Sequence, residues 1–178
     1  MPKKILAIVG SATTNSANHR LMENLIVRTS RRFEYIKAPA LKTLPPFDPH
    51  LIPDAVPEPV KLVRQQIRES DAVLISTPEY IFSIPSGLKN LFEWCVSTTV
   101  FQSKPVGLIT ASAQGEAGQR ELERILQTLM ARFTEQTSIR IPGISAKFDR
   151  DGLITDCETD RQLDTFLQAF ESLVRESS

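Results

Sequence analysis

Five short strand-like runs, mostly apolar, alternate with segments of helical spacing, and this alternation constrains the fold more than any other feature. The runs lie at residues 5–9, 33–36, 72–76, 106–110 and 138–141. Between and after them, apolar residues recur every three or four positions, within residues 21–26, 60–67, 88–96, 122–133 and 163–174. Apolar strands separated by helices are typical of a parallel sheet with helices on both faces. The sequence therefore predicts an α/β, doubly wound three-layer sandwich, since a TIM barrel needs eight such units and typically about 250 residues.

The length of 178 residues suits one domain, residues 1–178. A proline-rich stretch, residues 44–59, follows the second predicted strand. It could be a linker between domains, but neither side is long enough to be a separate domain, so an ordered excursion is favoured. Its prolines are Pro45, Pro46, Pro49, Pro53, Pro57 and Pro59.

The charge balance argues against nucleic acid or an anionic membrane as a partner. Lys and Arg total 21, as do Asp and Glu, so the formal net charge is zero and no global field attracts a polyanion. No apolar stretch approaches the roughly 20 residues of a membrane span, and the apolar run after Lys3 and Lys4 is too short for a signal peptide. Cys95 lies on an apolar helical stripe, which favours a reduced core thiol. These features predict a cytoplasmic protein.

Three loops are the candidates for a ligand site. In open parallel sheets, ligands bind beyond the carboxyl ends of the strands, where the strand order reverses. The loops after the first, third and fourth strands, residues 10–18, 77–86 and 111–118, are rich in polar residues, small residues or prolines. The opposite loops have no such concentration.

The first loop has the composition of a phosphate site. Hydroxyls and free backbone N–H groups at a helix N-terminus suit a phosphate monoester. The alternative is a helix cap with spare polar residues, but one cap needs only one such residue. Neither a dinucleotide fingerprint nor a Walker loop is present. The six polar residues within positions 11–18 are Ser11, Thr13, Thr14, Asn15, Ser16 and Asn18.

The second and third loops are suited to a flat ligand. Pro78, Tyr80 and Pro85 would form rigid walls, while Gly115 and Gly118 would let the backbone approach from the other side. Taken singly, Tyr80 could be an ordinary surface aromatic and Gly118 a helix-start residue. Their coincidence at adjacent strand ends favours a site.

No familiar set of catalytic side chains is evident. The two histidines lie in no metal-ligand spacing, and the GxSxG nucleophile motif is absent. Glu79 is the one acid in the expected pocket, and it could equally be structural, through a bond to backbone. A flat-ligand site without an acid and base suggests that a cofactor carries the reaction.

These loops resemble those of the NADPH-dependent FMN reductases, flavodoxin-like enzymes that include quinone, azo-dye and metal-ion reductases. The second motif is the most specific, and the resemblance covers nearly the whole chain. The matching residues are Gly10, Ser11, Ser16 and Asn18 in the first loop; Pro78, Glu79, Tyr80, Ser83, Pro85, Leu88, Lys89, Asn90, Glu93 and Trp94 in and after the second; and Ser112, Gly115 and Gly118 in the third.

The resemblance implies a flavodoxin-like sheet of order 2-1-3-4-5 and an FMN site. Around the FMN phosphate it implies Ser11, Thr13, Ser16, Ala17 and Asn18; around the isoalloxazine ring it implies Pro78, Glu79, Tyr80, Ile81, Ser112 and Gly115. Two departures stand out. Thr13 occupies a position where the family usually has an arginine, and Ile81 one where it often has a polar residue.

The function that the resemblance implies is ping-pong hydride transfer from NADPH or NADH to FMN and on to a small acceptor. The acceptor would be a quinone, free flavin, azo compound or metal ion. One alternative is a flavodoxin-type electron carrier, although such carriers are expected to be strongly acidic. Another is a flavin-free binding or regulatory protein. A homodimer or homotetramer is also implied, with part of the Trp94 ring left for a partner; burial of Trp94 in its own subunit is the alternative.

Overall fold

Five parallel strands form one sheet in a computed structural model that describes residues 2–51 and 55–176. The strand order is β2-β1-β3-β4-β5, which confirms the expected topology. Every strand is paired in parallel with its neighbours. The strands are β1 (Lys3–Val9), β2 (Phe33–Lys37), β3 (Ala72–Thr77), β4 (Val106–Ser112) and β5 (Ser138–Pro142).

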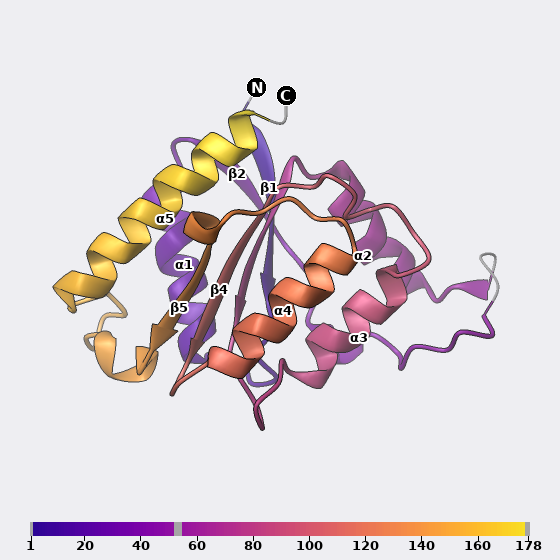
Figure 1. The fold of residues 1–178 in the computed structure, drawn as a ribbon, viewed down its shortest axis with the longest axis horizontal. Helices are drawn as coiled ribbons and strands as arrows, with labels where there is room; N and C mark the ends of the chain where they lie inside the picture. Colours follow the sequence, from indigo (N-terminus) through magenta and orange to yellow (C-terminus); the bar gives the residue numbers. More distant parts are fainter. Residues whose placement is uncertain (1, 52–54, 177–178) are drawn as a thin grey trace.

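Helices cover both faces of this sheet (Figure 1), as the apolar strands predict. On one face lie α1 (Ala17–Thr29) and α5 (Cys157–Arg175), whose buried side chains pack on the sheet through residues such as Leu21 and Phe166. On the other lie α2 (Glu58–Glu69), α3 (Ser86–Cys95) and α4 (Glu116–Thr128), packed through residues such as Val60, Leu88 and Leu122. The sandwich is therefore a flavodoxin-like α/β fold.

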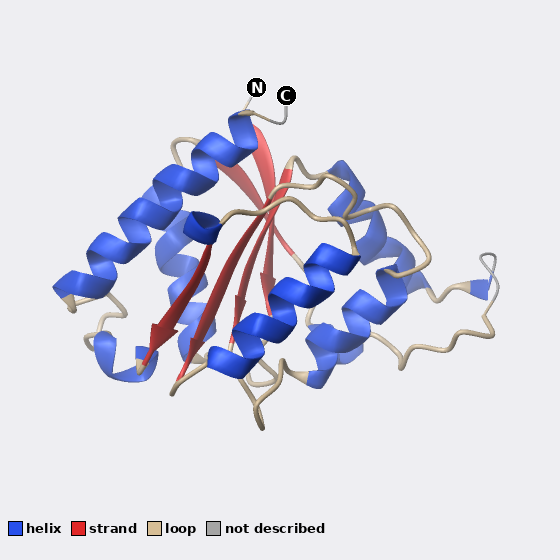
Figure 2. Ribbon diagram, in the orientation of Figure 1, coloured by secondary structure: helices blue, strands red, loops and turns tan. Residues whose placement is uncertain are grey.

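The carboxyl ends of β1, β3 and β4 meet at one edge of the sheet, where Figure 2 shows the arrowheads together. The pairing register sets Val9 beside Ser76 and Thr77 beside Thr110. Gly10 follows directly and donates its N–H to the Ser76 carbonyl at 2.9 Å. A Cβ on Gly10 would lie 2.4 Å from Thr77 Oγ1, so only glycine allows this close approach. The three polar loops consequently leave the sheet next to one another.

The fourth helix is shorter than its apolar spacing predicts. The spacing continues to Phe133, but α4 ends at Thr128 because Met130 adopts a left-handed backbone with φ of 58°. Leu129 and Phe133 still pack, partly buried, against the core. Apolar periodicity thus continues past the helix end, and the prediction of a helix through Phe133 is wrong.

The proline-rich stretch, residues 44–59, is ordered in its described part and is hydrogen-bonded to α3. The Pro45 carbonyl accepts hydrogen bonds from Asn90 Nδ2 at 2.9 Å and from Trp94 Nε1 at 2.8 Å. The Phe47 ring packs edge-on against Trp94, with centroids 5.2 Å apart. Residues 52–54, which include Pro53, lie outside the described residues.

Trp94 is buried within its own chain. Only 1% of its surface is exposed, because the excursion covers the ring. The prediction that part of this ring is left for a partner subunit is therefore wrong. No helix in the described parts of the chain is both long and apolar enough to cross a membrane.

Candidate active site

The loop from β1 to α1 has more polar groups than its helix cap requires. Ser16 is the N-cap: its Oγ accepts from the His19 N–H at 3.3 Å and lies 2.9 Å from His19 Nδ1. Thr13 and Thr14 remain exposed, and the Ala17 and Asn18 N–H groups stand in the first helical turn, where no intrahelical acceptor exists. The cap accounts for Ser16 alone, so the Ala17 and Asn18 N–H groups and the exposed Thr13 and Thr14 hydroxyls could donate to an anion.

Asn18 has a different place from the one expected. Its side chain is 98% buried, donates from Nδ2 to the Ala111 carbonyl at 2.9 Å and accepts at Oδ1 from Ser76 Oγ at 2.8 Å. These hydrogen bonds connect the start of α1 to the ends of β3 and β4. The Asn18 side chain therefore braces the loops, and only its backbone N–H is available to a phosphate.

Glu79 in the second loop has a structural bond. Its Oε2 accepts from the Gly118 N–H at 2.7 Å, at the start of α4, and the Glu79 carbonyl lies 3.4 Å from Ser112 Oγ. The sequence left open whether Glu79 is an acid of the ligand pocket or a structural residue bonded to backbone. Its bond to the Gly118 N–H supports the structural role. Pro78 is buried beside Glu79, whereas Tyr80 has 40% of its surface exposed.

Residues Tyr80 to Ser83 form a tight hairpin turn that the sequence did not indicate. The Tyr80 N–H donates to the Ser83 carbonyl at 2.8 Å, and the Ser83 N–H returns to the Tyr80 carbonyl at 3.1 Å. Ile81 and Phe82, at the tip, both have left-handed backbone, with φ of 50° and 58°. The side chain of Ile81 is directed into solvent, so of its groups only the backbone could contact a ligand held below the turn.

The third loop closes the opposite side. Gly115 caps α4 with φ of 89°, a conformation that favours glycine. The Ser112 carbonyl accepts from the Gly143 N–H at 2.7 Å, which holds the end of β4. Across the site, the Tyr80 hydroxyl lies 3.3 Å from Ser11 Oγ. The three loops that contain the expected site residues are thus joined by hydrogen-bond contacts at one edge of the sheet.

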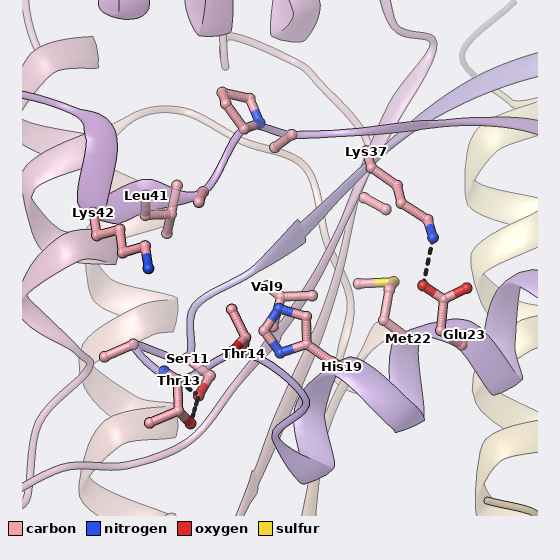
Figure 3. Close-up of a pocket in the computed structure, with 15 residues that line it drawn as sticks. Val9, Ser11, Thr13, Thr14, His19, Met22, Glu23, Lys37, Leu41 and Lys42 are labelled. Atoms are coloured by element: carbon pink, nitrogen blue, oxygen red, sulfur yellow. Dashed lines mark hydrogen bonds and ion pairs between the residues drawn. The ribbon is translucent and has the colours of Figure 1, made fainter.

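A cavity of about 300 Å³ adjoins the first loop, on the side toward β2 (Figure 3). Ser11 and Thr13 line it together with His19, Lys37 and Lys42. Lys37 is ion-paired with Glu23 at 2.5 Å, while no partner of the Lys42 amino group is recorded within the described chain. Neither lysine was among the predicted site residues, because both lie between the second strand and the proline-rich stretch, outside the three candidate loops.

His19 stands beside these charges as a neutral side chain at neutral pH. Its partial burial lowers the pKa below the usual value, the Glu23 carboxylate raises it, and Lys37 lowers it. Its Nδ1 is engaged with Ser16. The lowered pKa favours the neutral imidazole at neutral pH, and Lys42 lines the same cavity as Ser11 and Thr13 of the first loop.

The donor set fits FMN. Residues 10–18 contain hydroxyls and free amides but no acid, as a phosphate requires. Tyr80 and the backbone of the second and third loops border the space next to it, as a planar ring requires. The first and second loops follow β1 and β3, between which the strand order reverses, and this is where ligands bind in flavodoxin-like nucleotide-binding folds.

Comparison with known proteins gives the family. The model of the NADPH-dependent FMN reductases matches residues 3–141, and the chain belongs to that family. The expected resemblance is thereby confirmed. At the level of the family, so is the expected class, an oxidoreductase that uses FMN and NAD(P)H.

Individual relatives extend over nearly the whole chain. The "NADH:(hydroxy)cinnamate reductase subunit CrdA" of Vibrio ruber is 31% identical over 172 residues, 93% of this chain and 84% of that protein. The quinone reductase of Escherichia coli K12 is 29% identical over 180 residues, covering 97% and 95% of the two chains. The solved structure of FerB, a flavoenzyme NAD(P)H:(acceptor) oxidoreductase from Paracoccus denitrificans, has a TM-score of 0.82 and 28% identity, covering 98% of each chain.

Proposed function

We propose that the protein is an FMN-dependent NAD(P)H oxidoreductase that reduces a small planar acceptor of the quinone class. Relatives named as quinone reductases support this class of acceptor. When bound, FMN supplies the ring that takes a hydride from NAD(P)H and passes its electrons on. NAD(P)H gives up two electrons and one proton, and solvent supplies the second proton that completes the hydroquinone.

In this proposal the first loop holds the phosphate. The hydroxyls of Ser11 and Thr13 and the N–H groups of Ala17 and Asn18 would donate to its oxygens. Ser16 would act chiefly by capping α1, which aims those amides at the anion. Lys42 would add positive charge from the far wall of the adjoining cavity.

The other two loops would border the ring and supply no acid or base. Tyr80 and the backbone of the following turn would lie along one edge, and Ser112 and Gly115 along another. The Glu79 carboxylate accepts a hydrogen bond from the Gly118 N–H, so it holds the second and third loops in place relative to each other. The observation that carries the proposal is the contact between Ser11 and Tyr80, which joins the phosphate loop to the ring loop.

The test is a titration of the purified protein with FMN and with riboflavin, followed by flavin fluorescence. FMN should bind more tightly than riboflavin, because only FMN carries the phosphate. Tyr80→Ala should weaken FMN binding by about 3- to 10-fold, the range expected for an aromatic contact, and slow turnover. Its urea midpoint should stay near that of the natural protein, since Tyr80 is partly exposed and belongs to neither hydrophobic core cluster. Failure to bind either flavin would favour the flavin-free regulator.

We also propose a homodimer or homotetramer in the cytoplasm. Two relatives are named as subunits, which supports the formation of an oligomer. Trp94 gives no such support, because its ring is buried within its own chain. Both cysteines are free thiols, and one is exposed, as suits a reducing compartment. Light scattering at micromolar concentration tests the assembly, and a monomer would contradict it.

A further inference from the structure

The turn from Tyr80 to Ser83 has a backbone shape that its own residues disfavour. Its central residues, Ile81 and Phe82, both have positive φ, 50° and 58°, as in a type I′ hairpin turn. Such turns are usually built from Asn-Gly or Asp-Gly, and positive φ is an outlier for a β-branched residue such as isoleucine. Packing does not compensate for this strain, because Ile81 has 94% and Phe82 78% of its surface exposed. Contacts outside the tip must therefore hold the turn in this shape.

Glu121 on α4 makes such contacts on the C-terminal side of the turn. Its Oε2 accepts a hydrogen bond from Ser83 Oγ at 2.5 Å and another from the Ile84 N–H at 3.2 Å. Lys89 Nζ, on α3, lies 3.6 Å from Glu121 Oε1. This carboxylate thus connects the turn with both α3 and α4, which lie side by side on one face of the sheet (Figure 1).

The Glu121 carboxylate is ionised at neutral pH. Burial raises its pKa, but the hydrogen bonds from Ser83 and the Ile84 N–H, together with Lys89, bring that pKa below its ordinary value. Hydrogen bonds to an ionised acceptor are about twice as strong as those between neutral groups. Glu121 is therefore a stronger acceptor for the turn than a neutral side chain would be at this position.

The N-terminal side of the turn is attached to the same helix. Glu79 Oε2 accepts from the Gly118 N–H at 2.7 Å. Gly118 and Glu121 are three residues apart on α4, so they lie on one side of the helix. Between these two attachments, backbone bonds of 2.8 and 3.1 Å join Tyr80 and Ser83 in both directions. Of the two attachments, the one through Glu121 bonds to a residue of the turn itself.

The turn also determines where the Tyr80 side chain lies. Tyr80 is the first residue of the turn, and its hydroxyl lies 3.3 Å from Ser11 Oγ in the first loop. Because Ser83 is bonded to the Tyr80 backbone in both directions, a turn that relaxed at Ser83 would move Tyr80 as well. The position of the Tyr80 ring beside Ser11 therefore depends on the bonds that hold Ser83.

We propose that Glu121 is a positioning residue for the flavin site: by holding the strained turn, it keeps Tyr80 beside Ser11. This inference rests on the proposed function, in which Tyr80 borders the FMN ring. In this role Glu121 acts on FMN only through Tyr80. Two consequences distinguish the role from general support of the fold. Loss of Glu121 should weaken FMN binding only when Tyr80 is present, and a turn with a favourable sequence of its own should no longer need Glu121.

The first measurement is amide hydrogen exchange, followed by NMR on the protein without flavin. Exchange of the Tyr80 and Ser83 N–H groups should be about tenfold faster in Glu121→Ala, because the turn opens more often. Glu121→Gln keeps an oxygen acceptor and should restore most of the protection. Glu123→Ala is the matched control and should leave both rates unchanged. Glu123 is a second carboxylate on α4 that accepts from a serine, Ser138 Oγ at 2.6 Å, away from the turn.

The second measurement is the dissociation constant of FMN, from fluorescence titration. Glu121→Ala should weaken FMN binding by no more than Tyr80→Ala does, about 3- to 10-fold, because Tyr80 makes the contact. In a protein that already carries Tyr80→Ala, the added Glu121→Ala should weaken it no further. In a protein with Ile81→Asn and Phe82→Gly, whose turn has the favoured Asn-Gly sequence, Glu121→Ala should change neither FMN binding nor exchange.

Several results would overturn the inference alone. These are unchanged exchange or unchanged FMN binding in Glu121→Ala, the same effects in Glu123→Ala, and an equal loss of FMN binding from Glu121→Ala with and without Tyr80. A loss that persists with the Asn-Gly turn would also overturn it. Failure of the proposed function is recognised separately, because the natural protein would then bind no FMN. The inference would fail with it, even if the exchange rates, which need no flavin, showed that Glu121 holds the turn.

Discussion

The affinity for the FMN phosphate should depend most on the side chains at positions 13 and 42. Thr13 offers a hydroxyl where the family usually has an arginine, and it bonds with Ser11 at 3.3 Å between hydroxyl oxygens. Lys42 comes from the short helical turn Leu41–Thr43 and lines the same cavity. A phosphate can be held by amides and hydroxyls, each charge-assisted bond contributing about 1.5–3 kcal/mol. One lysine at a distance then adds a smaller, screened contribution.

Charge changes at these two positions should act on FMN and leave riboflavin alone. Thr13→Arg should tighten FMN binding by ~1 kcal/mol, about fivefold, because the loop is exposed and the charge is partly screened. Lys42→Gln should weaken it by a similar amount. Lys61→Gln is the control, since Lys61 pairs with Glu58 on α2, a different element. Equal effects on both flavins, measured by fluorescence titration, would mean that the phosphate does not lie in the first loop.

At the level of single residues, the sequence indicated which loop is polar, but it did not indicate the hydrogen-bond partners of the side chains. It predicted a polar first loop at the carboxyl edge of the sheet, but not the buried bonds of Asn18 with Ser76 and Ala111. Those bonds depend on three-dimensional contacts between α1 and two strands, which spacing does not encode. The Ile81–Phe82 turn gave no signal either, because its residues are not the usual turn formers.

At the scale of elements, the strands were easier to predict than the ends of helices. The three central strands, β1, β3 and β4, are short apolar runs whose burial on both faces follows from the parallel sheet. The end of α4 was predicted too late in the sequence. Leu129 and Phe133 keep the apolar spacing of a helix and pack on the core, although the helix itself ends at Thr128. Lys37 and Lys42 were not predicted as site residues. The pairing of β2 with β1 brings their segment to the site, and the spacing of residues in the sequence does not show this pairing.

The N-terminus of α5 gives a stability test that does not depend on the ligand. Asp156 caps this helix, accepting from the Thr159 hydroxyl at 2.5 Å, the Thr159 N–H at 3.0 Å and Lys147 Nζ at 3.1 Å. The Thr159 side-chain bond, then its backbone bond, then Lys147 lower the pKa of Asp156 to about 2. The ordinary value, as in the unfolded chain, is 3.8.

Because the folded pKa lies below the unfolded one, the stabilisation is complete above about pH 4 and is lost as the pH falls toward 2. Asp156→Asn keeps a capping side chain but removes the titration. We therefore expect the urea midpoint of the natural protein to fall more steeply than that of Asp156→Asn in this range. Asp151→Asn, on an exposed loop, is the control. Parallel curves for the natural protein and Asp156→Asn would contradict the assignment.

At the scale of the whole molecule, neutrality favours an enzyme over an electron carrier. Lys plus Arg equals Asp plus Glu, 21 each, so the molecule has no net field to steer a charged protein partner. Structural similarity to an archaeal flavodoxin, at 8% identity and a TM-score of 0.61, concerns the fold alone. A small acceptor that binds at the open crevice needs no such field.

The central claim is that FMN held by the three loops takes hydride from NAD(P)H before the acceptor binds. The most direct test is anaerobic rapid mixing of the FMN-loaded protein with NADPH, and separately with NADH, while the flavin absorbance is recorded. A saturable loss of absorbance is expected with at least one of the two in the absence of acceptor, and the absorbance should return when a quinone is added. Bound FMN that keeps its absorbance with both nucleotides would contradict the account.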